Sequence, residues 1–248
     1  MDKDKIKRAF GRAALTYDDH AYVQKIASEK LIRLTESLPY PKHVLEIGCG
    51  TGYLTSKLLS LYQKVPYLAT DISEDMIKHC KEKYLRYVPR LNFQVQDGEK
   101  IDFDFSSDWI ISSFAFQWFE KQLDSIQTLY QNSQYLIFTT LLEGTFQEWK
   151  ELCNKFNFPD KVLCFINEDD FLTKIRSLNP QYLSIETEKE FYPTPLSFLT
   201  RLRNIGAHES RNSDKRMNIK NMKKVIEKKE PLEISYRVAY CILKNDSF

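Results

Sequence analysis

Short apolar runs alternate with longer amphipathic stretches through the middle of the chain. The runs predict buried strands at 44–47, 66–70, 91–96, 108–113 and 134–140, and the stretches between them predict helices at about 53–62, 74–87 and 121–131. This alternation indicates an α/β fold with a parallel sheet and right-handed crossovers. Ligands of such sheets bind at the carboxyl ends of the strands, so the residues that follow each strand are the first candidates for a site.

The two ends of the chain extend this core. Residues 1–40 are expected to form an N-terminal helical cap, and 43–191 the core of one domain that spans 1–248. Further helices are predicted around 145–156 and from 167 onward, with Asn167 as a helix cap. Residues 182–191 and 232–242 alternate as strands do, which gives seven strands in all, the last within 231–248. The stretch 192–230 between them is too long for a hairpin turn and predicts a helical lid insertion over the site.

Composition narrows the class of protein. The 248 residues carry a net charge of +2 and five scattered cysteines without a C-x-x-C pair, which predicts reduced thiols without zinc or disulfides. The sequence contains no apolar run long enough to span a bilayer and begins without the apolar core of a signal peptide. We therefore expect a cytoplasmic protein that does not contact a membrane.

Three of the seven glycines lie in one loop, Glu46-x-Gly48-x-Gly50-x-Gly52, between a predicted strand and a predicted helix. Glycine permits positive φ and removes the Cβ that would keep a ligand away from the backbone. The third glycine comes one residue too early for the dinucleotide-binding pattern. The spacing resembles the first motif of Rossmann-like, S-adenosylmethionine (SAM)-dependent class I methyltransferases, although an ordinary tight turn remains the alternative.

Acids at the next two strand ends strengthen that interpretation. Asp71, followed by Ile72, ends the second strand and could accept both ribose hydroxyls of a nucleoside. Asp97, followed by Gly98, ends the third strand and could accept the adenine amino group. Together with the glycine loop these positions predict SAM binding, with another nucleotide or no ligand as the alternatives. Class I methyltransferases usually insert an antiparallel last strand beside the sixth, which fits a mostly parallel seven-stranded sheet here.

The tip of the fourth strand argues against one substrate class. Methyltransferases that act on amino nitrogens often carry Asn/Asp-Pro-Pro-aromatic there, whereas this chain has Ser112-Ser113-Phe114-Ala115. We therefore do not expect a base-amine methylase. Nearby, Gln117 and Trp118 are candidates to line a substrate pocket, with Trp118 equally acceptable in the core.

The predicted insertion is strongly basic. Positions 201–229 contain ten lysines and arginines but only three acids, which gives a local charge of +7, compared with +2 for the whole chain. A solvated lysine-rich helix face would explain this, and so would a docking surface for an acidic partner. Aromatic residues are sparse in the segment, so it lacks the stacking surface of a single-strand RNA binder, and we do not expect nucleic acid as a partner.

Several segments resemble the malonyl-[acyl-carrier protein] O-methyltransferases of biotin synthesis. They are Phe10-Gly11-Arg12-Ala13-Ala14 with Tyr17, His20 and Gln24, then Ser112-Ser113-x-Ala115-x-Gln117-Trp118, then Phe138-Thr139-Thr140-Leu141 with Glu143-Gly144-Thr145-Phe146, and finally Leu202-Arg203-Asn204-Ile205-Gly206-Ala207 with Pro231-Leu232-x-x-Ser235-Tyr236. Two departures stand out, because the family usually has asparagine at Ser113 and lysine at Arg203. Arginine and lysine are not equivalent donors, so the second departure bears on substrate recognition.

The resemblance implies methyl transfer from SAM to the free carboxylate of a malonyl thioester on acyl-carrier protein, which is the expected partner. A carboxylate is already ionised at neutral pH, so neither a general base nor a metal is expected. The predicted cofactor-binding residues are Arg12, Glu46, Gly48, Gly50, Asp71, Ile72, Asp97, Gly98 and Ser112. The predicted catalytic residues are Tyr17, closing over the methionine end, and Arg203, orienting the malonyl carboxylate. The predicted substrate-binding residues are His20, Gln117, Trp118, Arg201 and Arg203.

Other functions would share the same cofactor site. One alternative is a SAM-dependent methyltransferase that acts on another small acid or on a quinone-like ring. Another is a non-catalytic SAM-binding protein whose basic insertion holds a partner. The basic insertion also leaves an RNA methyltransferase open. Assays of malonyl thioesters beside free acids and phenols would separate these functions.

Overall fold

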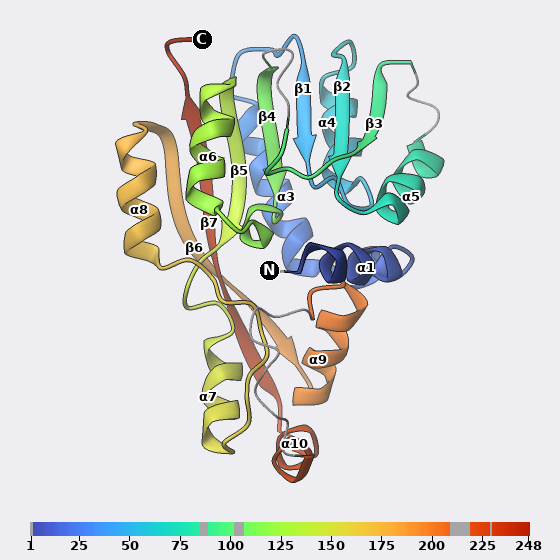
Figure 1. The fold of residues 1–248 in the computed structure, drawn as a ribbon, viewed down its shortest axis with the longest axis vertical. Helices are drawn as coiled ribbons and strands as arrows, with labels where there is room; N and C mark the ends of the chain where they lie inside the picture. The colour runs from blue at the N-terminus through green and yellow to red at the C-terminus, as the bar shows by residue number, and fades with distance from the viewer. Residues whose placement is uncertain (1, 85–88, 102–106, 209–218, 229) are drawn as a thin grey trace.

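A computed structural model describes residues 2–84, 89–101, 107–208, 219–228 and 230–248. Within these ranges, seven strands form one sheet in the order β3-β2-β1-β4-β5-β7-β6, and β7 runs antiparallel to both of its neighbours (Figure 1). The strands are β1 Val44–Ile47, β2 Tyr67–Asp71, β3 Leu91–Val95, β4 Ser107–Ser113, β5 Ser133–Leu141, β6 Pro180–Tyr192 and β7 Leu232–Lys244. The predicted fold class, a mostly parallel seven-stranded sheet with an antiparallel last strand, is confirmed.

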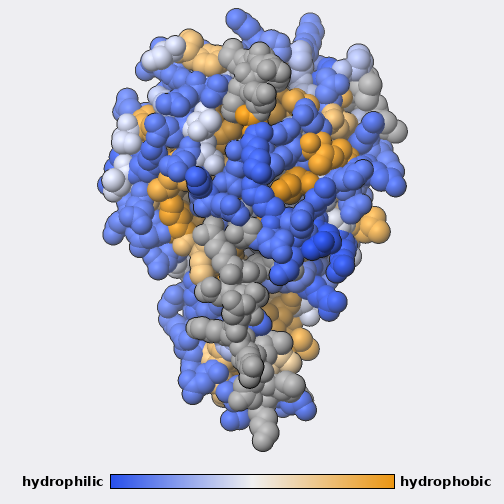
Figure 2. All heavy atoms as spheres, viewed as in Figure 1, coloured by the Kyte–Doolittle hydropathy of each residue, from blue (hydrophilic) through white to orange (hydrophobic). Residues whose placement is uncertain are grey.

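Helices cover both faces of the sheet. They are α1 Lys3–Ala13, α2 Tyr17–His20, α3 Tyr22–Thr35, α4 Tyr53–Leu61, α5 Glu74–Tyr84, α6 Gln122–Gln131, α7 Gln147–Lys155, α8 Glu168–Ser177, α9 Pro195–Asn204 and α10 Ile219–Ile226, with a 3₁₀ turn at Phe116–Trp118. Asn167 caps α8 as predicted, its side chain accepting from the backbone of the first turn. In the described part of the chain, no helix is long and apolar enough to cross a bilayer. The face seen in Figure 2 is largely hydrophilic.

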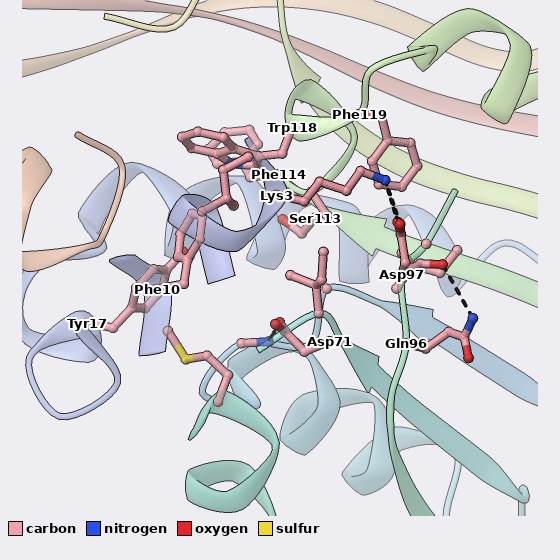
Figure 3. Close-up of a pocket in the computed structure, with 18 residues that line it drawn as sticks. Lys3, Phe10, Tyr17, Asp71, Gln96, Asp97, Ser113, Phe114, Trp118 and Phe119 are labelled. Atoms are coloured by element: carbon pink, nitrogen blue, oxygen red, sulfur yellow. Dashed lines mark hydrogen bonds and ion pairs between the residues drawn. The ribbon is translucent and has the colours of Figure 1, made fainter. Parts of the chain in front are cut away.

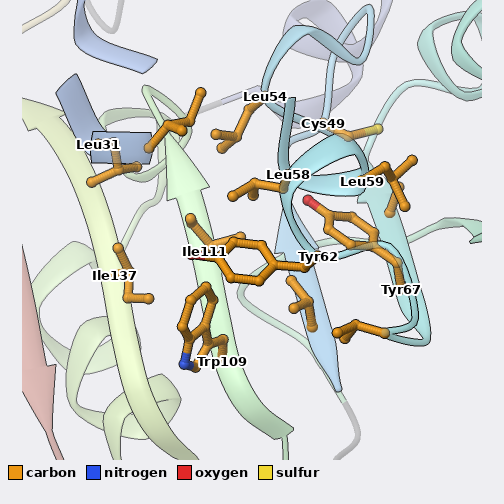
Figure 4. Packing of buried hydrophobic residues seen from close by; sticks show 14 of the residues in the cluster. Leu31, Cys49, Leu54, Leu58, Leu59, Tyr62, Tyr67, Trp109, Ile111 and Ile137 are labelled. Carbon is orange, nitrogen blue, oxygen red and sulfur yellow. The ribbon is translucent and has the colours of Figure 1, made fainter. Parts of the chain in front are cut away.

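Alternating residues of the central strands pack against the two helical layers. Trp109 and Ile111 of β4 join a cluster with Leu31 of α3 and Leu58 of α4 (Figure 4). Ile110, between them, faces the opposite layer of α6 and α8. All three β4 residues are at most 1% exposed, as expected for a parallel strand that is buried on both faces.

The hairpin of β6 and β7 extends beyond the other strands and supports a third apolar cluster. We call this part, made of α7, α9, α10 and the adjoining hairpin residues, the lower lobe (Figure 1). Trp149 of α7, Phe198 of α9 and Val225 of α10 are buried in its core. α9 begins with a capping box between Thr194 and Ser197. The predicted helical insertion thus contains α9 and α10, while part of its basic stretch lies outside the described residues.

Helix α1 lies along the carboxyl ends of the parallel strands, where it meets both α5 and α9 (Figure 1). Gly206, just after α9, has φ +72°, and a Cβ there would lie 2.8 Å from the Cα of Phe10. The Thr16 hydroxyl also donates to the Asn204 carbonyl at 2.8 Å. The N-terminal cap and α9 therefore enclose the strand ends from the same side.

Candidate active site

The glycine loop brings backbone close to the strand ends. Gly48 and Gly50 have φ +73° and +54°, and the Gly48 and Cys49 amides both donate to the Thr70 carbonyl of β2, at 2.8 and 2.9 Å. A Cβ at Gly48 would lie 2.5 Å from the Ala115 Cβ, whereas a Cβ at Gly50 would project into open space. Glycine is required at the first position by close packing and keeps the second position open for a ligand.

Asp71 is held rigidly at the end of β2. Its Oδ2 accepts from the Gly50 amide at 3.0 Å and its Oδ1 from the Ser73 amide at 2.8 Å. Burial raises the pKa of Asp71, and these backbone donors act in the opposite direction. The carboxylate joins the glycine loop to β2 and has lone pairs left for a nucleoside diol.

A chamber of about 720 Å³, partly open to solvent, lies between α1 and the strand ends (Figure 3). We call it the cofactor chamber. Six of the predicted cofactor residues line it: Gly48, Gly50, Asp71, Ile72, Asp97 and Gly98. A glycine cradle, a fixed carboxylate at β2 and an acid at β3 fit the adenosine part of SAM.

The far end of the cofactor chamber is closed by Lys3 of α1. The Lys3 ammonium lies 2.8 and 2.6 Å from the two carboxylate oxygens of Asp97 and 2.6 Å from Glu99 (Figure 3). Burial alone would lower the pKa of Lys3, but hydrogen bonds to Asp97 and Glu99 raise it. Asp97, the predicted adenine acceptor, thus also fastens the N-terminal helix.

A second chamber lies on the other side of the glycine loop, and we call it the methionine-end chamber. Glu46, Gly48 and Gly50 line it. Glu46 is 1% exposed, and its Oε2 accepts from the Thr55 hydroxyl at 2.5 Å and from the Tyr67 hydroxyl at 2.6 Å. Burial raises the pKa of Glu46 to about 7. A bound ammonium such as that of methionine would offset this cost of burying a carboxylate.

A third chamber, the apolar chamber, lies between the strand ends and the lower lobe. Aromatic and aliphatic residues supply most of its wall, among them Phe114, Phe146 and Leu202. Gln24 and Gln117 contribute its amide groups. No lysine, arginine or carboxylate belongs to the described residues that line it, so a bound substrate would be shielded from water by neutral groups.

Tyr17 is the side chain that borders all three chambers. Burial and the nearby carboxylates of Asp71 and Asp18 raise the pKa of Tyr17. The phenol is therefore a neutral hydrogen-bond donor over the physiological pH range. Tyr17 thus lies at the predicted methionine end, and its catalytic role there stays a prediction.

Phe114, whose backbone is strained, lies with Tyr17 where the cofactor chamber meets the apolar chamber. It has φ +54°, uncommon for an aromatic residue, and lines both the cofactor chamber and the apolar chamber. The Gln117 amide holds this turn by donating to the Phe114 carbonyl at 2.7 Å. Trp118 lines the same two chambers, so Gln117 and Trp118 both reach the predicted pocket.

Three predicted residues near the chambers have other partners. The Ser112 hydroxyl is buried and donates to the Ile47 carbonyl at 2.9 Å, while the next residue, Ser113, lines the cofactor chamber. His20 lies 2.9 Å from the Asn204 amide, through its Nε2. Arg201 pairs with Glu190 at 2.9 Å and donates to the His20 carbonyl at 3.1 Å. His20 and Arg201 therefore join α2 to α9.

The two remaining predicted residues are arginines on helix surfaces. Arg12 on α1 and Arg203 on α9 are exposed, and neither lines one of the three chambers. Their predicted contacts with cofactor or substrate stay predictions. Among the described residues, no group of three or more histidine, cysteine or carboxylate side chains is arranged to hold a metal ion.

Sequence reasoning missed several residues of the site. Lys3 and Phe10 reach the cofactor chamber from α1, and Phe146 reaches the apolar chamber from the segment before α7. The Phe10 ring packs edge-on against Trp118 with centroids 5.2 Å apart. The clustering of an aromatic residue with small residues at 10–14 was a usable signal, whereas nothing local marked Lys3.

Comparisons with known proteins indicate the family. The Methyltransferase domain family matches residues 44–133. Malonyl-[acyl-carrier protein] O-methyltransferase 2 of Ilyobacter polytropus is 32% identical over 248 residues, covering 97% of this chain and 92% of the relative. A relative of Magnetococcus marinus named malonyl-[acyl-carrier protein] O-methyltransferase is 28% identical, covering 96% and 90%.

The fold has counterparts among solved structures. A putative methyltransferase of Bacillus halodurans superposes with a TM-score of 0.59 at 11% identity, covering 88% of this chain and 97% of that protein. Such low identity supports the fold alone. The family follows instead from the curated relatives, whose similarity runs from the N-terminal cap to the last strand. The chain belongs to the malonyl-[acyl-carrier protein] O-methyltransferase family of SAM-dependent methyltransferases.

Proposed function

We propose that this protein transfers the methyl group of SAM to the free carboxylate of malonyl-[acyl-carrier protein]. The observation that carries the proposal is the apolar chamber, which adjoins the cofactor site at Tyr17 and has no ionised side chain among its described lining residues. A small charged substrate on a thioester arm could enter it and leave as a neutral ester. The ester would prime the chain synthesis that leads to biotin, because it hides the charge of the malonyl group.

The reaction needs alignment more than proton transfer. SAM supplies an electrophilic methyl group on a sulfonium. A carboxylate oxygen of the substrate donates a lone pair to form the O–CH₃ bond, and the C–S electrons return to sulfur, leaving a thioether. No proton moves, since the carboxylate is ionised at neutral pH. The protein therefore has to bring oxygen, methyl and sulfur into line and exclude water.

The described residues divide this work. Asp71 and the loop glycines would hold the adenosine, and Glu46 would hold the methionine ammonium. Tyr17, kept neutral by its raised pKa, would cover the sulfonium and limit the approach of water. Phe114 would form the wall that separates nucleoside from substrate. We expect Tyr17 to act by position, because its phenol is a poor acid in this surrounding.

Arg203 keeps its proposed role in recognising the malonyl carboxylate. Its guanidinium is exposed in this structure, so a direct contact requires α9 to turn inward. Arg203→Ala should then raise the KM for the malonyl thioester and leave the Kd for SAM unchanged. If both constants worsened equally, Arg203 would be supporting the fold.

We also propose that α10 helps to dock the acidic carrier protein. Lys223 and Lys224 are exposed on this helix in the lower lobe, the part of the molecule that borders the apolar chamber. Charge complementarity accelerates encounter and weakens as salt is added. Lys223→Gln with Lys224→Gln should raise the KM for carrier protein and flatten its salt dependence. Lys64→Gln with Lys81→Gln, two exposed lysines outside the lobe, is the matched control.

The decisive experiment measures methyl transfer from labelled SAM to malonyl-carrier protein, beside acetyl-carrier protein and malonyl-coenzyme A. The proposal expects transfer to malonyl-carrier protein, none to acetyl-carrier protein, and weaker transfer to the coenzyme A thioester. Absence of transfer to every malonyl thioester, with SAM binding demonstrated in the same preparation, would overturn it. Free small acids and phenols would then be the next substrates to assay.

A further inference from the structure

Gln24 on α3 lies where the methionine-end chamber meets the apolar chamber. Among the described residues, Tyr17 and Gln24 are the two that line both of these chambers. An acceptor oxygen must come within reach of the sulfonium methyl at this boundary. Gln24 would therefore lie beside the reacting atoms of the proposed transfer.

The position of Gln24 is fixed by its own helix. Ser28, one turn further along α3, lies on the same helix face and also lines the methionine-end chamber. The Ser28 and Ser113 hydroxyls are hydrogen-bonded at 3.1 Å, which ties this face of α3 to the tip of β4. Buried Val23 and Ala27 hold the adjacent side of the helix in the core. The Gln24 side chain thus starts from a rigid backbone.

The Gln24 amide is available for a ligand. It is half-buried, and none of the hydrogen bonds or ion pairs between described residues uses its side chain. Gln117, the other amide of the apolar chamber, already donates to the Phe114 carbonyl at 2.7 Å. The Gln24 amide at the edge of the apolar chamber can therefore form a hydrogen bond to a ligand.

The two arginines of α9, the charged candidates to orient the substrate carboxylate, are either paired with another side chain or outside the chamber lining. Arg201 pairs with Glu190 at 2.9 Å, and Arg203 is exposed outside the chamber lining. A tight ion pair would also lower the nucleophilicity of the attacking oxygen. A neutral amide can orient a carboxylate and leave most of its charge available for attack.

From this geometry we propose that the Gln24 amide donates a hydrogen bond to the substrate carboxylate and orients its attacking oxygen toward the methyl group. The inference rests on the proposed function, because it names a positioning residue for that same transfer. Tyr17 would complete the arrangement from the opposite border of the junction. The bonds made and broken are those of the methyl transfer itself, with no added proton step.

Two variants test the proposal with malonyl-carrier protein as substrate. Gln24→Leu removes the donor, and kcat/KM should fall about 10- to 100-fold, as expected for a lost hydrogen bond to a charged group. Gln24→Glu keeps the shape and opposes the substrate charge, so the loss should exceed that of Gln24→Leu at pH 8. The Kd for SAM and the unfolding temperature should stay close to those of the wild type.

The pH profile of Gln24→Glu separates positioning from a structural role. Below its pKa the introduced carboxyl is protonated and can donate, so the ratio of variant to wild-type kcat/KM should rise as the pH falls from 8 toward 5.5. Gln131→Glu on α6, exposed and outside the chambers, makes the same charge change elsewhere. Its ratio should stay near one at every pH.

Three outcomes would overturn the inference while the wild type still methylates malonyl-carrier protein. The first is unchanged kcat/KM in Gln24→Leu. The second is an equal loss of SAM affinity, which would assign Gln24 to the cofactor. The third is a pH-independent ratio for Gln24→Glu. Failure of the wild type on every malonyl thioester would instead remove the proposed function, and the inference with it.

Discussion

Glu46 offers a test that joins stability to function. The carboxyl is buried beneath the glycine loop, and desolvation raises its pKa from 4.5 to about 7. A raised carboxyl pKa means that the native state holds its proton more tightly than the unfolded chain does. Stability from this group is therefore fully present below about pH 4.5 and is lost as pH rises through about 7. Glu46→Gln removes this titration and keeps the shape of the side chain.

The magnitude follows from the shift. Each pKa unit corresponds to about 1.4 kcal/mol, so the full effect is about 3 kcal/mol. Urea unfolding of both proteins without SAM, at about pH 5 and pH 8.5, measures it. We expect the unfolding free energy of Glu46→Gln minus that of the wild type to grow by about 2 to 3 kcal/mol between the two conditions. All other titrating groups are common to both proteins and cancel in this difference.

The same change should weaken the cofactor site. At pH 8.5 the wild type presents an ionised carboxylate to the methionine ammonium, and the variant presents a neutral amide. We expect the Kd for SAM to rise about tenfold, the loss of one charge-assisted hydrogen bond. A stability difference that is the same at both pH values would refute the reasoning, because Glu46 would then not titrate between them. Thr55→Val, which removes one of its donors at 2.5 Å, should move the wild-type transition upward in pH.

Three further changes test the geometry around the chambers. Gly48→Ala places a Cβ 2.5 Å from that of Ala115 at φ +73° and should lower the unfolding free energy by about 2 kcal/mol or more. Gly50→Ala should lower the unfolding free energy less but weaken SAM binding. Calorimetry that found Gly50→Ala the more destabilising of the two would contradict this. Lys3→Ala removes partly exposed ion pairs and should weaken SAM binding by up to about fivefold, while tighter binding would mean that the ammonium competes with adenine. Tyr17→Phe should lower kcat with malonyl-carrier protein more than it raises the Kd for SAM, and equal changes would count against its place at the junction.

Local sequence patterns were sufficient to predict the sheet, because each strand and the site residues that follow it are adjacent in the sequence. The Val44–Ile47 run, the three glycines after it and the acid at Asp71 are all contiguous with the strands that carry them. Their chemistry is also fixed by the backbone, since the Gly50 amide meets Asp71 through the parallel pairing of β1 and β2. The cofactor side of the site could therefore be read from the strand ends.

The substrate side depends on packing between distant segments, which no local pattern encodes. Phe10 of α1, Phe114 after β4 and Phe146 before α7 meet at chambers built from three parts of the chain. Their apolar character is equally compatible with an ordinary core. Whether Ser112 or Ser113 faced the cofactor depended on the pleat of β4, because successive residues of a strand point to opposite faces. In the structure, Ser113 lines the cofactor chamber and Ser112 does not.

The two arginines of α9 have different surroundings in the folded chain. Sequence reasoning gives a carboxylate substrate an arginine partner, since opposite charges attract. In the folded chain Arg201 is held by Glu190, an acid on β6, and Arg203 is exposed. A guanidinium beside the sulfonium of SAM would place two cations close together in a weakly polar chamber, where their repulsion is poorly screened, so the proposed contact of Arg203 has to be with the carboxylate oxygen that does not attack. The neutral Gln24 amide that we propose as a donor avoids that repulsion, and the sulfonium itself then supplies the positive charge that draws the carboxylate in.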